Sequence, residues 1–254
     1  MQYGISNLAL VPMRAEAADT AEMTNQILFG EHFKVLEKRK KWSKIRLAHD
    51  KYEGWICNKQ WQEVDKETYT QLDKSTPTLT TDLLDVVKGN QLQPIVMGST
   101  LPFFSDGTLK VVETTYQLDG LTTQGSKEKS ALVNNAMMYL NAPYLWGGRS
   151  PLGIDCSGFS QMVYRLQGVA LPRDAYQQAE IGTTLSFIEE SEAGDLAFFD
   201  NAEGKITHVG VMLSDNYIIH ASGKVRIDRL DQQGIFNAEE RSHTHQLRLI
   251  KSII

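Results

Sequence analysis

The sequence predicts an all-β N-terminal half made of two small barrels, followed by an α+β C-terminal half. Three observations predict this division. Apolar and polar residues alternate with period two in the first half, helical spacing begins only after Gly125-Ser126, and strand-like segments return near residue 196. We expect domains at residues 1–72, 73–125 and 126–254.

The two barrels are predicted from short strands, turns and one linker. In the first, Ile45 and Leu47 alternate with basic residues, as in a half-buried strand. Residues 74–78, Lys-Ser-Thr-Pro-Thr, are polar and contain a proline, which is typical of a linker. In the second, residues 105–108 form a hairpin turn before another strand. No strong helical periodicity occurs before residue 126.

The C-terminal half combines two helices with later strands. Leu132, Ala136, Met137 and Leu140 have helical spacing, and this helix should end near Asn141. The second predicted helix has apolar residues at i, i+3, i+4 and i+7, namely Phe159, Met162, Val163 and Leu166. The strand candidates are 196–199, 208–213, 217–220 and 246–250.

Composition excludes several classes of protein. The 254 residues are 41% hydrophobic and carry a net charge of −5, so we expect no nucleic-acid partner. Cys57 and Cys156 cannot form a disulfide framework or a four-sulfur zinc site, and we expect no metal and no cofactor. No segment is long enough for a membrane span. We expect a monomer, cytoplasmic if the chain is complete and periplasmic or secreted if a leader was removed.

A cysteine at the start of the second helix is the first chemical signal. Cys156 lies in the first turn, where the helix dipole and unpaired N–H groups favour a thiolate. The same N–H groups can donate to an oxyanion formed when sulfur attacks a carbonyl. Taken alone, an intracellular cysteine is more often a small buried hydrophobe, and this alternative stays open.

Two histidines supply the second signal. His208 begins one apolar strand and His220 ends the next, with a short turn between them. If Leu213 pairs with Tyr217, Gly210 lies opposite His220, and both histidines point to one face. His208 would then take the proton from Cys156, and His220 would orient His208. Structural histidines on an ordinary hairpin remain the alternative.

Six ordered motifs in residues 126–250 resemble the NlpC-type cell-wall peptidases, a papain-like cysteine peptidase family. They are Tyr144-Leu-Trp-Gly-Gly, Asp155-Cys-Ser-Gly-Phe, Leu171-Pro-Arg-Asp, Gly194-Asp-Leu, His208-Val-Gly and His220-Ala. The resemblance implies a papain-like α+β domain with Cys156 as nucleophile, His208 as general base and His220 as third member of the triad. The family cleaves peptidoglycan peptides, commonly between γ-D-glutamate and a diamino acid.

The N-terminal half resembles two bacterial SH3-type domains. This arrangement is similar to that of the γ-D-glutamyl-L-diamino-acid endopeptidases of murein peptide recycling. The resemblance implies a murein peptide substrate with a free N-terminal L-alanine, because the first SH3-like domain closes one end of the cleft in those enzymes. A free ammonium requires a carboxylate partner in a partly dry pocket.

Eight residues are the predicted substrate-binding set. Asp155 and Glu16 supply candidate carboxylates, and Tyr52 a hydroxyl from the first barrel; Tyr144 matches the family's tyrosine near the nucleophile. Trp146 would form an apolar wall, and Ser157, Arg173 and Asp174 would bind polar groups. Alternatively, Glu16 is an exposed loop acid, Tyr52 is barrel core, and Asp155 only caps its helix. Ala175 stands where the family often has a serine, so one substrate contact is in doubt.

Two other functions fit the same residues. A wall-binding module with a vestigial triad would bind murein peptides without cutting them. An acyltransferase or amidase would use the same triad for a different acyl transfer.

Overall fold

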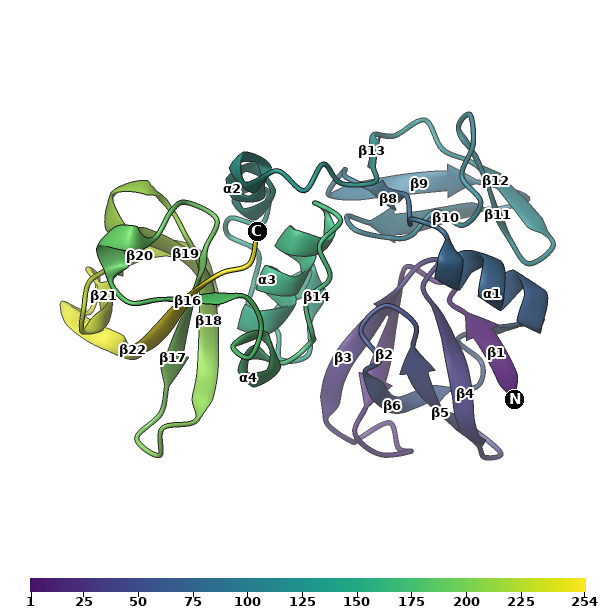
Figure 1. Cartoon of the computed structure of the whole chain (residues 1–254). Helices are drawn as coiled ribbons and strands as arrows, with labels where there is room; N and C mark the ends of the chain where they lie inside the picture. The colour runs from purple at the N-terminus through teal and green to yellow at the C-terminus, as the bar shows by residue number, and fades with distance from the viewer. The chain divides into compact units, whose positions relative to one another are not determined.

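The structure is a computed structural model that describes residues 1–254 (Figure 1). The chain forms two compact units, residues 1–124 and 125–254, which are described separately. No helix combines the length and apolar character that crossing a bilayer requires.

The first unit begins with a seven-stranded antiparallel sheet in the order β3-β2-β6-β5-β4-β1-β7. Its strands are β1 Gln2–Ile5, β2 Leu10–Arg14, β3 Met23–Leu28, β4 His32–Lys38, β5 Trp42–Leu47, β6 Glu53–Cys57 and β7 Gln62–Val64. The alternation predicted for β5 is confirmed, since Ile45 and Leu47 are buried and Arg46 is exposed. These two side chains join Val11, Ile27 and other apolar residues in the core of the sheet.

A short helix, α1 (Lys66–Lys74), occupies a region where no helix was predicted. Asp65 caps it by accepting the N–H of Thr68 at 2.7 Å. Tyr69 and Leu72 are its only buried residues, so its apolar stripe is too short to give a clear periodic signal.

The rest of the first unit contains two smaller sheets. The four-stranded sheet has the order β10-β9-β12-β11, formed by β9 Leu84–Lys88, β10 Leu92–Val96, β11 Thr108–Val111 and β12 Thr114–Gln117. Strand β8 (Leu79–Thr80) pairs with β13 (Thr122–Thr123). The turn predicted at 105–108 is confirmed, because Ser105 and Thr108 form a bridge where β11 begins.

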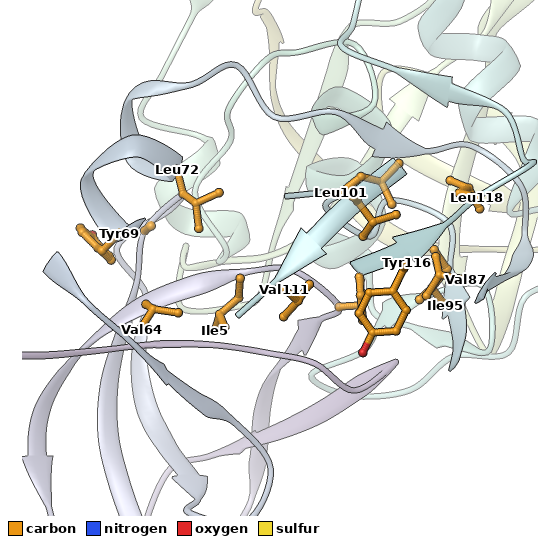
Figure 2. Packing of buried hydrophobic residues seen from close by; sticks show 13 residues of the cluster. Ile5, Val64, Tyr69, Leu72, Val87, Ile95, Leu101, Val111, Tyr116 and Leu118 are labelled. Carbon is orange, nitrogen blue, oxygen red and sulfur yellow. The ribbon is translucent and has the colours of Figure 1, made fainter. Parts of the chain in front are cut away.

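One hydrophobic core joins the parts of the first unit that were predicted as separate barrels. Figure 2 shows Tyr69 and Leu72 of α1 in the same cluster as Ile5, Val111 and Tyr116. The N–H of Thr100 also donates to the carbonyl of Phe29 at 2.9 Å. The two predicted barrels therefore share buried apolar side chains across the predicted linker.

The second unit contains three α-helices and one short hairpin before its large sheet. The helices are α2 Lys129–Met138, α3 Cys156–Arg165 and α4 Ala175–Gln178, and the hairpin pairs β14 (Arg149–Ser150) with β15 (Gly153–Ile154). Both predicted helices are present. The predicted stripe of α2 is only half buried, since Leu132 and Ala136 are enclosed while Met137 and Leu140 are exposed.

A six-stranded antiparallel barrel completes the second unit. It consists of β17 Leu196–Asp200, β18 Ile206–Met212, β19 Tyr217–Ser222, β20 Lys224–Leu230, β21 Gly234–Asn237 and β22 Ser242–Ser252, with β16 (Thr183–Leu185) added beside β22. Pairing of β21 with β22 closes the barrel. Short 3₁₀ turns lie at Ile188–Glu190 and Ser214–Asn216. Helix α3 packs against β18, which brings its N-terminus to the strand that carries His208.

Candidate active site

Cys156 is the first residue of α3, as predicted. Asp155 caps the helix, and its Oδ1 accepts the N–H of Gly158 at 2.7 Å. Position 158 requires glycine, because a Cβ there would lie 2.3 Å from the carbonyl oxygen of Gly148. The loop that contains Gly148 therefore packs closely against the first turn of α3, which carries Cys156.

The sulfur of Cys156 faces strand β18. The residue is 7% exposed, and its Sγ lies 4.0 Å from the carbonyl oxygen of Thr207. Burial, together with the charge of Asp155, raises the pKa of the thiol to about 12, although the N–H groups of Val209 and Ser157 and the charge of Arg173 act in the opposite direction. The expectation of a thiolate favoured by the helix N-terminus is thus wrong for the free protein, because desolvation outweighs the N–H donors.

The two predicted histidines meet on one face of the β18–β19 hairpin. Gly210 pairs with His220, and Leu213 donates its N–H to Tyr217, so the predicted register is confirmed. His208 Nε2 lies 2.9 Å from His220 Nδ1. Both residues are buried, and burial lowers the pKa of His208 well below its usual value. His208 is therefore a neutral imidazole near neutral pH.

Asp228 on β20 continues this line of contacts, and its part in the site was not predicted. Its Oδ2 lies 3.0 Å from His220 Nε2 and 2.6 Å from Arg226 Nε. Burial opposes its ionisation, but the His220 and Arg226 donors hold the pKa of Asp228 below its usual value. The signal was present in the sequence, since residues 224–228 alternate charged and apolar side chains after His220.

These contacts determine which nitrogen of His208 is basic. An ionised Asp228 only accepts hydrogen bonds, so His220 carries its hydrogen on Nε2. With one hydrogen on each ring, His220 Nδ1 then accepts the Nε2–H of His208, which leaves His208 Nδ1 with a free lone pair. We call His208, His220 and Asp228 the histidine chain. It presents an unprotonated Nδ1 from the residue between Thr207 and Val209, the two residues whose backbone contacts the Cys156 sulfur.

His245 on β22 covers His208. The two rings are stacked with centroids 4.2 Å apart and planes at 27°, and His245 meets His220 edge-on at 5.7 Å. Burial lowers the pKa of His245 to about 4, so its ring is neutral near neutral pH. Its neighbour His243 bonds to Asp231 at 2.8 Å instead. No group of three or more metal-ligating side chains forms at these histidines or elsewhere in the chain.

Three of the predicted substrate-binding residues bond to one another beside the nucleophile. Arg173 donates from Nη2 to Asp155 Oδ2 at 2.6 Å and from Nη1 to Ser157 Oγ at 2.9 Å. Asp155 also accepts the N–H of Gly147 at 2.8 Å. Arg173 is 2% exposed and Asp155 5%, so this ion pair is enclosed and orients the first turn of α3.

Three other predicted residues lie on loops in the same unit. Burial raises the pKa of Tyr144 to about 12, and the electrostatic influence of Cys156 acts in the same direction. Trp146 is 59% exposed, as an open apolar wall requires. Asp174 precedes α4, and its N–H donates to Gln177 at 3.3 Å.

Glu16 and Tyr52 belong to the first unit. Glu16 is exposed and lines a small hollow with Arg39 and Trp55, where the guanidinium of Arg39 lies 4.2 Å from the centroid of Trp55. Tyr52 is partly buried and packs against the core of the seven-stranded sheet, and its N–H donates to Asp50. Glu16 is thus open to a ligand, whereas Tyr52 is partly used in packing.

Comparisons with known proteins agree with this geometry. Residues 141–241 match the NlpC/P60 family, and residues 13–60 match the bacterial dipeptidyl-peptidase SH3 domain. A dipeptidyl-peptidase 6 from Lysinibacillus sphaericus is 31% identical over 84% of this chain and 86% of that protein. A γ-D-glutamyl-L-lysine dipeptidyl-peptidase from Bacillus cereus is 27% identical over 79% of this chain and 67% of that protein.

A solved structure extends the likeness to the fold. A crystal structure of an NlpC/P60 family protein from Bacillus cereus covers 99% of each chain, with a TM-score of 0.80 and 19% identity. The matched region contains Cys156, His208 and His220, and the SH3 match lies within the first unit. The chain therefore belongs to the NlpC/P60 family and is a cysteine peptidase with an N-terminal bacterial SH3 domain.

Proposed function

We propose that this peptidase hydrolyses the bond between γ-D-glutamate and a diamino acid in murein peptides that have a free N-terminal L-alanine. The observation that supports the proposal is the histidine chain, whose His208 lies on β18 between Thr207 and Val209, the two residues whose backbone contacts the Cys156 sulfur. The name of the Bacillus cereus relative, a γ-D-glutamyl-L-lysine dipeptidyl-peptidase, supports the choice of bond.

The proposed reaction proceeds through a thioester. His208 Nδ1 takes the proton of the Cys156 thiol as sulfur bonds to the carbonyl carbon, and the carbonyl oxygen becomes an oxyanion. As the C–N bond breaks, His208 gives that proton to the leaving amine. Water then attacks the thioester, with His208 again as base, which releases the acid and restores the thiol.

The predicted binding residues have different parts in this proposal. Glu16 is exposed and would accept the substrate ammonium, and Tyr52 would add its hydroxyl. Asp155 and Arg173 would act mainly by holding the first turn of α3, because each already bonds within the protein. Tyr144, Trp146, Ser157 and Asp174 would line the acyl side of the sulfur.

The domain organisation that goes with this function is also proposed. Residues 126–254 would form a papain-like domain, and residues 1–72 and 73–125 two SH3-like domains that share one core.

Replacement of the nucleophile tests the mechanism. Cys156→Ala should abolish hydrolysis of L-Ala-γ-D-Glu-diaminopimelate while the peptide still binds. The matched control is Cys57→Ala, which changes the other cysteine and should leave turnover within about twofold, as for surface changes. Near wild-type turnover by Cys156→Ala would disprove the thiol mechanism. Product analysis by mass spectrometry separates hydrolysis from transfer of the acyl group to an added amine.

A second comparison tests the free amine. N-acetylation of the L-alanine should lower kcat/KM by about tenfold or more, since a charge-assisted hydrogen bond is lost. Glu16→Gln should bring the kcat/KM values of the free and N-acetylated peptides closer together. Equal rates on the free and acetylated peptides would remove Glu16 and Asp155 from amine binding.

A further inference from the structure

A polar hollow lies beside the histidine chain in the second unit. It has a volume of about 730 Å³ and is lined by the β17–β18 loop, the β20–β21 turn and the first half of β22. We call it the β22 hollow. Its lining residues include Asp200, Thr207, Gln233 and His245.

The β22 hollow adjoins the reacting atoms at two points. Thr207 lines it, and the carbonyl oxygen of the same residue lies 4.0 Å from Cys156 Sγ. His245 also lines it, and its ring stacks on His208 at 4.2 Å. The hollow is therefore bounded by one residue that contacts the nucleophile and by one that contacts the base.

The chemistry of the reaction indicates which half of the substrate comes here. The proposed acyl-side residues belong to α3 and to the loops before it and before α4. The leaving amine takes its proton from His208, so the leaving residue has to lie within reach of the strand that carries His208. Thr207 of that strand lines the β22 hollow.

The lining indicates what kind of residue leaves. Asp200 is its one carboxylate, and no lysine or arginine lines the hollow, so an ammonium in the hollow would be attracted to Asp200. The carboxylate of Asp200 is 10% exposed, and its nearest cation, Arg248 Nε, is 3.7 Å away on an exposed side chain, which leaves the carboxylate able to take another donor. Amides such as that of Gln233 offer both donors and acceptors for the backbone of an amino acid.

We propose that the β22 hollow binds the diamino acid that leaves on cleavage, and that Asp200 accepts the hydrogen bond of its side-chain ammonium. This proposal rests on the proposed function, because it assigns a place to the leaving half of that substrate. It makes Asp200 a specificity-determining residue and leaves the covalent chemistry to Cys156 and His208.

Two peptides that differ only in the ammonium test the proposal. The full-length protein would be assayed on L-Ala-γ-D-Glu-L-Lys and on the same peptide ending in L-norleucine. Wild-type kcat/KM should favour the lysine peptide by about tenfold, as expected for one hydrogen bond to a charged group. Asp200→Asn should bring the ratio close to one while the rate on the norleucine peptide stays within about twofold.

Asp215→Asn is the matched control. Asp215 is exposed in the turn between β18 and β19, so this variant makes the same charge change in the same unit outside the hollow. It should keep the wild-type ratio. An unchanged ratio in Asp200→Asn, or an equal loss on both peptides, would overturn the proposal.

A binding measurement separates this proposal from the proposed function. Free L-lysine would be titrated into ¹⁵N-labelled protein, and shifts are expected at the amides of residues 200–202 and 243–247 in the wild type but not in Asp200→Asn. If the wild type cleaves neither peptide, the proposed function fails. The lysine-dependent shifts then test by themselves whether the β22 hollow binds a diamino acid. Absence of lysine-dependent shifts there would overturn it.

Discussion

Asp228→Asn is the most informative single change in this protein, because it alters hydrogen positions while keeping nearly the same shape. In the wild type, Asp228 accepts from His220 at 3.0 Å and from Arg226 at 2.6 Å through the same oxygen, and from Arg226 at 2.9 Å through the other. An asparagine amide has only one acceptor oxygen where the aspartate has two. In one orientation its NH₂ group faces the N–H donor of Arg226 that bonded to Oδ1. In the other orientation its NH₂ group faces His220 and donates to it.

The expected loss of activity follows from these contacts. One hydrogen bond to a charged group contributes about 1.5–3 kcal/mol, and each 1.36 kcal/mol is about tenfold in rate, so its loss alone predicts about 10- to 150-fold. If the amide donates to His220 Nε2, both histidines change tautomer and His208 Nδ1 is no longer basic. An Asp→Asn change of this kind beside a catalytic histidine lowers kcat by about 10⁴-fold in a serine protease. We expect a fall of at least about 100-fold in kcat.

The assay uses a fluorogenic substrate, L-Ala-γ-D-Glu joined to aminomethylcoumarin, so that the leaving group needs no ammonium. Asp231→Asn is the matched control, because Asp231 also bonds to a histidine, His243, at 2.8 Å but is not linked to His208. The control should stay within about twofold of wild type. A kcat above one tenth of wild type in Asp228→Asn, with the fold intact by circular dichroism, would refute the tautomer assignment.

Three other predictions follow from the same site. The acid limb of kcat/KM should have an apparent pKa below 6.5, because burial lowers the pKa of His208 and keeps the base neutral to lower pH; a limb at or above 6.5 in rates measured from pH 4 to 8 would contradict this. His245→Ala should lower kcat/KM by about tenfold and raise the apparent pKa of the acid limb, because water then reaches His208. His245→Phe keeps a flat ring over His208 and should keep kcat/KM within about threefold of wild type. Equal pH profiles for the two variants would exclude a covering role for His245. Arg173→Met should destabilise the second unit by about 3–5 kcal/mol in urea unfolding, because Asp155 is left as an unpaired buried charge, and adding Asp155→Asn should recover part of the loss; a change below about 1 kcal/mol would show that the pair is not needed.

The parts of the site that could be predicted are those set by local pattern. The period of 3.6 located α3, and the short turn between two apolar strands determined that Gly210 pairs with His220. A strand register fixes which side chains share a face, so the contact between His208 and His220 followed from residues only 12 apart. The division into a β-rich half and an α+β half followed in the same way.

The parts that were missed depend on contacts between elements that are distant in sequence. His245 reaches His208 only because β22 closes the barrel, and barrel closure has no local signature. The core shared by α1 and the strands of residues 84–117 is of the same kind, since nothing around Tyr69 indicates its partners. The pKa of Cys156 was misjudged for a related reason. A helix start predicts N–H donors, but the desolvation that outweighs them comes from the packing of α3 against β18.

The protonation states of the two reacting groups explain why the histidine chain is needed. Burial raises the pKa of the Cys156 thiol and lowers the pKa of His208, so both effects favour a neutral thiol beside a neutral imidazole. The nucleophile is then activated at the moment of attack, when the proton moves to His208 and the negative charge moves on to the carbonyl oxygen. A transfer of that kind requires a lone pair on the correct ring nitrogen at all times. Asp228 provides this condition through two successive hydrogen bonds, which makes a carboxylate two rings away from the sulfur part of how the sulfur becomes reactive.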